Sequence, residues 1–316
     1  MKRINLSCFL LLITGVFAGA QDIPIRKSEV RFISSTVNVE ETTDNILNLE
    51  IGFSKKIFYS VDIQDAMAAA HVIILKIVQK TGISIQLTTS VYENNQTIIA
   101  DLKAKKLDLI AVLSEDLPEL IEQHVVDPFL IEVEEGDIYE NYILCTRKDR
   151  PGSGLKALSD KALTLSVWVE SDLPTYWLDL LLNEKHLAPV HSFFSQIDRI
   201  KRPEQAIMRV FFRKSDACLV PKQTFLVLKE MNPQIAREMT IVEESPDFIN
   251  GVICLNKSLT ELDRRSLIEE KLVNMKRETG GEQMMDLFRI HDFLPYDTMY
   301  VHDTFEVIKQ YQALKR

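Results

Sequence analysis

The chain has 316 residues, of which 46% are hydrophobic and 26% are charged. This composition is that of a globular protein rather than of a disordered or fibrous chain, and the length permits one large domain or two of ordinary size. The 37 basic and 46 acidic residues give a net charge of −9 at pH 7. That charge disfavours binding to nucleic acid or to anionic membranes, because both need cationic contacts.

The first twenty residues have the layout of a secretory signal. Lys2 and Arg3 precede an apolar run over residues 6–17, and the Ala-Gly-Ala of residues 18–20 is a small-residue cleavage site. The run is too short to span a bilayer; the alternative is a buried N-terminal helix. We expect residues 1–20 to be a signal peptide that directs the protein to the periplasm. Its removal would leave a mature chain with a net charge of −11.

After a loose polar leader over residues 21–45, residues 46–135 are expected to form the first part of one lobe. Strands and helices alternate in this segment. The expected elements are a strand at 49–53, a helix at 63–81, a strand at 83–87, a helix at 95–105 and a strand at 107–113. The strands read as buried on both faces, which favours a mostly parallel sheet covered by helices.

Residues 136–245 repeat this pattern and are expected to form a second lobe. Its expected elements are a strand at 163–169, helices at 174–183 and 203–212, a strand at 216–220 and a helix at 223–231. Extended segments over 129–146 and 240–255 flank this unit, which indicates that the chain crosses to it and then returns. We expect two hinge strands, paired near residues 140 and 248, on which the lobes close around a ligand.

Residues 246–316 are expected to complete the first lobe, with helices over 260–278 and 281–290 and one more helix over 304–314. The predicted fold class is therefore α/β, with two lobes that are each a mostly parallel sheet flanked by helices. Cys145, Cys218 and Cys254 remain after signal cleavage. They are either buried free thiols or one disulfide with a spare thiol.

The chain carries no GxGxxG, Walker A, GxSxG or HExxH sequence. His186 and His191 lie close together but lack the neighbouring ligands that a metal needs. We therefore expect no metal, no cofactor and no enzymatic activity. A catalytic triad assembled from distant residues stays open, since such sites are recognised by geometry.

Several segments resemble the type II periplasmic binding proteins of ABC transporters, most of all the phosphate, phosphite and phosphonate branch. They are Asp-Ala-Cys-Leu-Val over 216–220, Met-Asn-Pro over 231–233, Glu-Ser-Pro over 244–246 and Ala-Lys-Lys-Leu-Asp-Leu over 104–109. The resemblance covers roughly residues 49–290. It implies a monomeric protein that binds a small ligand, such as a phosphonate-type anion, for a transporter permease. The alternative is a ligand-sensing module of the same fold that works with a membrane signalling protein.

Ligands of open α/β sheets lie at the carboxyl ends of strands and beside helix N-termini. The loops after the first and third strands, 54–56 and 114–116, should therefore face the cleft. The candidate ligand-binding residues are Ser54, Tyr59, Ser114, Tyr142, Ser171, Thr175, Lys222 and Thr224. Asp172 either repels an anion or caps the following helix, with Pro174 in its first turn. Lys222 either pairs with an anion or is solvated.

Overall fold

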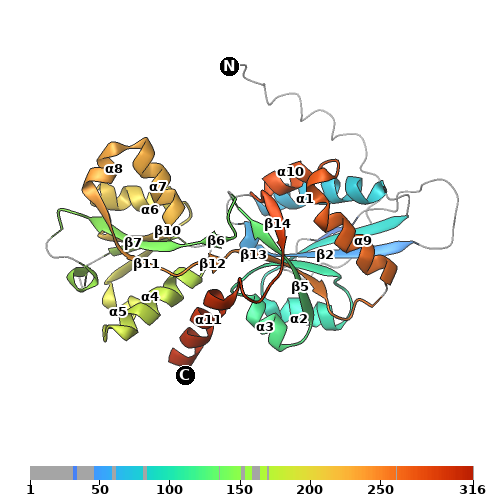
Figure 1. The fold of residues 1–316 in the computed structure, drawn as a ribbon, viewed down its shortest axis with the longest axis horizontal. Helices are drawn as coiled ribbons and strands as arrows, with labels where there is room; N and C mark the ends of the chain where they lie inside the picture. The colour runs from blue at the N-terminus through green and yellow to red at the C-terminus, as the bar shows by residue number, and fades with distance from the viewer. Residues whose placement is uncertain are drawn as a thin grey trace, which may run out of the picture.

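The structure is a computed structural model. It describes residues 31–33, 46–58, 62–80, 84–134, 136–150, 154–158, 164–168, 171–260 and 262–315. The predicted signal peptide, most of the predicted leader and Tyr59 lie outside the described residues. Figure 1 shows two bodies of sheet and helices side by side, joined at a narrow waist. Among the described residues, no helix has the length and apolar character needed to cross a membrane.

The first lobe is built on a seven-stranded sheet in the order β1-β3-β2-β4-β13-β5-β14. Its strands are β1 (Arg31–Ile33), β2 (Leu47–Ser54), β3 (Ile85–Tyr92), β4 (Leu109–Leu113), β5 (Val126–Val133), β13 (Gly251–Asn256) and β14 (Asp292–Pro295). The strands β3, β2 and β4 run parallel, while the other pairings are antiparallel. The sheet is therefore mixed, with parallel core strands as the sequence predicts.

Helices cover both faces of the first sheet (Figure 1). They are α1 (Ile63–Gln79), α2 (Asn95–Lys103), α3 (Leu117–Glu122), α9 (Leu262–Val273) and α10 (Gly281–Leu287), with the short 3-10 helices η2 (Lys55–Phe58) and η4 (Met275–Arg277). One core packs α1, α9 and α10 on the sheet, and a second packs α2 and α3 on its other face. The start of α1 is capped by Asp62, whose Oδ1 accepts hydrogen bonds from the backbone N–H groups of Gln64 and Asp65 at 2.9 and 3.2 Å.

The second lobe is built on a five-stranded sheet in the order β11-β7-β10-β8-β9. Its strands are β7 (Tyr142–Arg147), β8 (Thr164–Trp168), β9 (Gln196–Ile200), β10 (Ala217–Pro221) and β11 (Met239–Glu244). Its helices are α4 (Leu173–Glu184), α5 (Val190–Phe193), α6 (Pro203–Phe211), α7 (Lys222–Met231) and α8 (Pro233–Glu238), with the 3-10 helix η3 (Leu155–Leu158). The strands β10, β8 and β9 run parallel to one another, whereas β7 runs antiparallel to both of its neighbours, β10 and β11.

Two connectors join the lobes, as the sequence predicts. Within them β6 (Tyr139–Glu140) pairs antiparallel with β12 (Phe248–Ile249), so that Phe248 lies opposite Glu140 and Ile249 opposite Tyr139. The strand pair occupies the waist in Figure 1. The lobe boundaries that we propose, at residues 135 and 245, fall beside this pair.

The C-terminal helix α11 (His302–Leu314) differs from its predicted place with the first lobe. Its Val307 and Ile308 belong to the core of the second lobe, and Tyr311 stacks on Tyr176 of α4 with ring centroids 4.0 Å apart. Val301, just before the helix, is buried in the core of the first lobe. The chain therefore crosses between the lobes a third time, because Val307 and Ile308 of α11 pack into the core of the second lobe.

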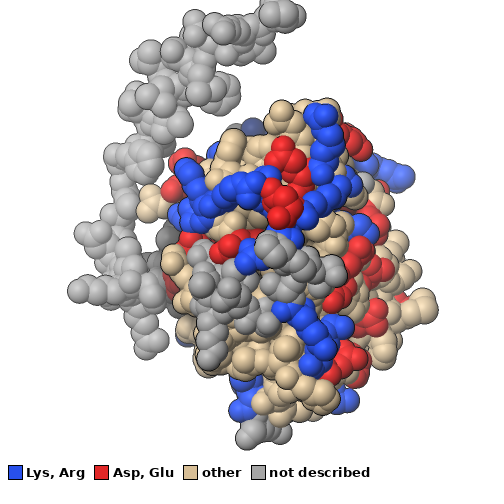
Figure 2. Space-filling view, turned by 90° about the vertical axis from the view of Figure 1, so that its left-hand side faces the viewer, with Lys and Arg blue, Asp and Glu red and all other residues tan. Residues whose placement is uncertain are grey.

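The structure settles the alternatives for the cysteines and shows how charged side chains are arranged at one end of the second lobe. The three described cysteines are buried and free, so no disulfide joins Cys145, Cys218 and Cys254 to one another. On the end of the second lobe that faces away from the first, Lys and Arg side chains lie among Asp and Glu side chains (Figure 2). Ion pairs of this lobe include Arg147 with Glu238 at 2.7 Å and Arg150 with Asp216 at 2.8 Å.

Candidate functional site

A cluster of charged side chains joins the two lobes at the ends of β2, β4 and α4. Glu115, which follows β4, accepts hydrogen bonds at Oε2 from the Ser171 hydroxyl at 2.6 Å and from the Asp172 N–H at 2.9 Å. Its Oε1 lies 2.6 Å from Nζ of Lys56 in η2, and Lys56 also lies 2.9 Å from Asp116 Oδ1. The Glu115 side chain is only 3% exposed. This carboxylate therefore bridges the first lobe to the second.

The start of α4 explains why a carboxylate lies there. The first N–H groups of a helix have no partner within the helix and attract negative charge. The Ser171 hydroxyl accepts a hydrogen bond from the Leu173 N–H at 3.1 Å while it donates to Glu115. Asp172 stands at the N-cap position but its side chain makes no capping bond, and Pro174 lies in the first turn. We call the Ser171 hydroxyl and the Asp172 N–H the α4 anion site.

The charges around the α4 anion site are mostly negative. Burial opposes the charge of Lys56, but attraction by Glu115 and Asp116 outweighs it and raises the Lys56 pKa above its ordinary value. Burial raises the pKa of Asp116, and it also raises the pKa of Asp172, where repulsion by Glu115 adds to the effect. Burial together with the charge of Asp172 raises the pKa of Tyr176 to about 12. Lys56 can therefore neutralise one anion in this cluster. A second anion would be repelled by the carboxylates around it.

Of the eight predicted ligand residues, the structure brings Ser171 into this cluster. Ser54 is buried at the end of β2. The Ser114 hydroxyl donates to the Ile249 carbonyl oxygen, which fastens the end of β4 to the hinge. The Tyr142 hydroxyl donates to Glu140 Oε2 at 2.5 Å, and its ring packs on Phe248 with centroids 5.9 Å apart. Ser114 and Tyr142 therefore support the connectors.

The remaining predicted residues lie at helix starts in the second lobe. Thr175 is half-buried in the first turn of α4. Lys222, at the start of α7, donates from Nζ to Glu244 Oε1, and its backbone N–H donates to the Asn141 carbonyl at 2.8 Å. Thr224 is half-buried two residues further along α7. Lys222 is thus engaged by a carboxylate of its own chain, and a ligand role for these three residues stays a prediction.

Sequence reasoning placed the loops 54–56 and 114–116 at the cleft and selected their hydroxyl groups. The structure uses the charged members of the same loops, Lys56, Glu115 and Asp116. The sequence does contain a signal for these three charged residues. They directly follow two parallel strands, β2 and β4, whose carboxyl ends meet at one edge of the sheet. That Glu115 reaches across to α4 depends on the placement of the second lobe, which no local pattern encodes.

Comparison with known proteins supports the two-lobe fold. Residues 61–300 match the family described as the periplasmic substrate-binding protein of the phosphonate ABC transporter. Among solved structures, XAC2383 from Xanthomonas citri bound to ATP is similar, with a TM-score of 0.63 and 14% identity over 85% of this chain and 98% of that chain. No match is found among the curated proteins.

Two phosphonate-related structures are also similar. A binding protein component of an ABC phosphonate transporter from Pseudomonas aeruginosa has a TM-score of 0.57 and 14% identity, over 85% of this chain and 87% of that chain. PhnD1 from Prochlorococcus marinus in complex with methylphosphonate has a TM-score of 0.56 and 14% identity, over 85% of this chain and 99% of that chain. At such identities these structures establish the fold.

Proposed function

Since the chain belongs to the family of periplasmic substrate-binding proteins of phosphonate ABC transporters, we propose that it binds a phosphonate-type anion at the α4 anion site and delivers it to a membrane permease. It acts by binding and lobe closure rather than by catalysis. Export to the periplasm would follow from cleavage of the predicted signal peptide after Ala20.

One observation carries this proposal: the α4 anion site already holds an oxyanion, the carboxylate of Glu115. A phosphonate oxygen can accept the same hydrogen bonds as a carboxylate oxygen, namely a short one from a hydroxyl and another from a helix N–H. Lys56 lies against the same carboxylate and is available to neutralise the incoming charge. The solute would therefore take the place of Glu115.

Displacing Glu115 lowers the affinity of the solute. A tethered group competes at an effective concentration of roughly millimolar or more, and Asp172 adds repulsion when it is ionised. Removing the Glu115 carboxylate should therefore tighten binding. Removing the Ser171 hydroxyl should weaken it, because a hydrogen bond to a charged group contributes about 1.5–3 kcal/mol.

Calorimetric titration with methylphosphonate tests the site. We expect Ser171→Ala to bind at least about tenfold more weakly than the wild type, and Glu115→Ala to bind about tenfold more tightly. Glu93→Gln is the matched control, because Glu93 is an exposed carboxylate that pairs with Lys55 at 2.8 Å. Equal affinities for all four proteins would show that the solute binds elsewhere.

The Glu115 contact also favours the alternative, a sensing module that works with a membrane signalling protein. Because Glu115 bridges the lobes with a side chain of the protein itself, a membrane partner could recognise the closed arrangement of the lobes. Methylphosphonate uptake by cells lacking this protein separates the two functions. Loss of uptake indicates transport, and unchanged uptake indicates sensing.

A further inference from the structure

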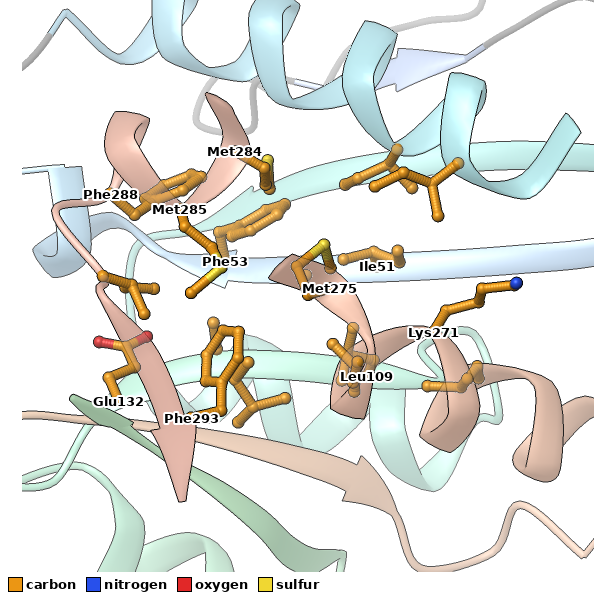
Figure 3. Close-up of a pocket in the computed structure, with 18 of the residues that line it drawn as sticks. Ile51, Phe53, Leu109, Glu132, Lys271, Met275, Met284, Met285, Phe288 and Phe293 are labelled. Carbon is orange, nitrogen blue, oxygen red and sulfur yellow. The ribbon is translucent and has the colours of Figure 1, made fainter. Parts of the chain in front are cut away.

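A cavity of about 100 Å³ lies inside the first lobe, between its sheet and the helices α1, α9 and α10. Its lining is overwhelmingly apolar (Figure 3). Phe53 and Phe288 stack there with ring centroids 5.6 Å apart, and Phe293 belongs to the same lining. Cavities of roughly this size with aliphatic and aromatic walls stay dry and accept a benzene-sized molecule.

One acidic side chain faces this cavity. Glu132 of β5 lies opposite Phe293 of β14, and its carboxyl group lies at one end of the lining side chains, beside Phe293 (Figure 3). In the part of the chain that the structure describes, this carboxyl has no hydrogen bond or ion pair with another residue. Burial raises the pKa of Glu132 to about 8, and the charge of Glu134 adds to the shift.

The backbone makes room for this carboxyl. A Cβ atom on Gly251 would lie 1.8 Å from Glu132 Oε2, so that any other residue at the start of β13 would push the carboxyl out of its place. Glu132 is half-buried, and a partly desolvated carboxyl without a partner is unfavourable for stability. Gly251 thus leaves space for this carboxyl beside the apolar cavity.

The lysine at the cavity does not serve as its partner. Nζ of Lys271 lies 2.8 Å from Glu278 and 3.4 Å from Glu270, and its amine points away from the cavity (Figure 3). The charged group that acts on the Glu132 carboxyl is the carboxylate of Glu134. Lys271 pairs instead with Glu278 and Glu270. The cavity thus has an apolar body and one acidic end.

We propose that this cavity is a second binding site, distinct from the cleft, for a compact amine with an apolar or aromatic body. The body would lie among Phe53, Phe288 and Phe293, and the ammonium group would pair with the Glu132 carboxylate. The site shares a wall with the cleft, since Phe53 and Ile57 line the cavity while Lys56, between them in sequence, pairs with Glu115.

Titration with benzylamine, with toluene as the probe that has the same ring but no amine, tests the proposal. We expect the wild type to bind benzylamine, and Glu132→Gln to bind it at least about tenfold more weakly. Glu282→Gln, an exposed carboxylate on α10, should bind it as the wild type does. Toluene should bind the wild type and Glu132→Gln equally.

A second readout reports the charge pairing itself. Pairing with an ammonium favours the ionised carboxylate, so that benzylamine binding at pH 7 should release a proton, detected by calorimetry in buffers of different ionisation enthalpy. Release should vanish in Glu132→Gln. Ala111→Leu, which fills the cavity, should abolish the binding of both probes.

The outcomes separate this proposal from the proposed function of the cleft. Glu132→Gln and Ala111→Leu should bind methylphosphonate as the wild type does, which also verifies that they are folded. No binding of benzylamine to the wild type, or equal binding to Glu132→Gln, would overturn the amine site and leave the cleft untouched. Failure of methylphosphonate binding alone would overturn the cleft proposal and leave the amine site.

Discussion

The Glu115 carboxylate accepts two hydrogen bonds from the second lobe while it pairs with Lys56 in the first. This arrangement makes Lys56 the neighbour that any anion at the α4 anion site would meet. Glu115, Asp116 and Asp172 surround it with negative charge, so its loss should affect binding more than the loss of an ordinary surface lysine.

Replacing Lys56 with Met should therefore weaken methylphosphonate binding by about tenfold or more, because the anion would face unopposed carboxylates. Lys55→Met is the matched control, since Lys55 is the preceding residue and pairs with the exposed Glu93. Calorimetry measures both. A loss of affinity that is equal in the two variants would mean that the effect is general and not due to the contact with Glu115.

Glu132 should make the stability of the protein depend on pH. Its pKa is about 8 in the folded chain, against an ordinary value of 4.5. Between these values the folded state binds more protons than the unfolded state, so that the free energy of unfolding falls as pH rises. The slope approaches about 1.4 kcal/mol per pH unit.

Urea denaturation of the wild type and Glu132→Gln between pH 5 and pH 8 checks this. The difference in unfolding free energy between the variant and the wild type should grow in favour of the variant as pH rises. Glu282→Gln provides the baseline. If Glu132→Gln and the wild type show parallel pH profiles, the carboxyl is solvated in the folded protein.

Side-chain roles were only partly predictable from the sequence. Ser171 could be placed at the cleft because it precedes a helix that follows a strand. Ser114 looked equivalent, yet its hydroxyl is bound by the Ile249 carbonyl of a strand more than a hundred residues away. Whether a hydroxyl faces a ligand or the chain depends on such distant partners, and local sequence does not contain them.

The helix α11 is the element whose position the sequence predicts least well. Its apolar stripe is visible in the sequence, but the stripe does not reveal that α4 is the partner. The Ile249 N–H donates to the Thr304 hydroxyl at 3.1 Å, which ties the start of α11 to the hinge strand β12. We infer that α11 moves with the second lobe.

Ile308→Ala should lower the free energy of unfolding by about 2–5 kcal/mol, because it leaves a cavity where a buried side chain packs between α11 and α4. Gln310→Ala, an exposed position on the same helix, should change it by less than about 0.5 kcal/mol. Urea denaturation measures both. Similar values for the two variants would show that α11 does not pack on α4 in solution.

Strands were predictable where they are buried. The core strands β4 and β10 carry continuous apolar residues, β2 has apolar residues at alternate positions, and all three lie close to their expected positions. The strands β9 and β14 were not predicted, and each is the last strand of its sheet. Edge strands need no apolar pattern on both faces, so polar sequences such as that of Gln196–Ile200 give little signal.

The whole molecule has two lobes joined by the connectors β6 and β12 and by α11. The order of elements in the sequence was sufficient to predict an inserted second lobe, because two extended segments flank it. It could not predict how close the lobes lie. That closeness is visible only in the contact of Glu115 with Ser171 and Asp172.

The most direct test of lobe closure is the radius of gyration of the mature protein, measured by small-angle X-ray scattering. The wild type should be compact without a solute, Glu115→Ala should be larger because the contact of Glu115 with Ser171 and Asp172 no longer holds its lobes closed, and methylphosphonate should return Glu115→Ala to the wild-type value. If Glu115→Ala has the wild-type radius with and without methylphosphonate, the carboxylate does not hold the lobes together and the account of the cleft is wrong.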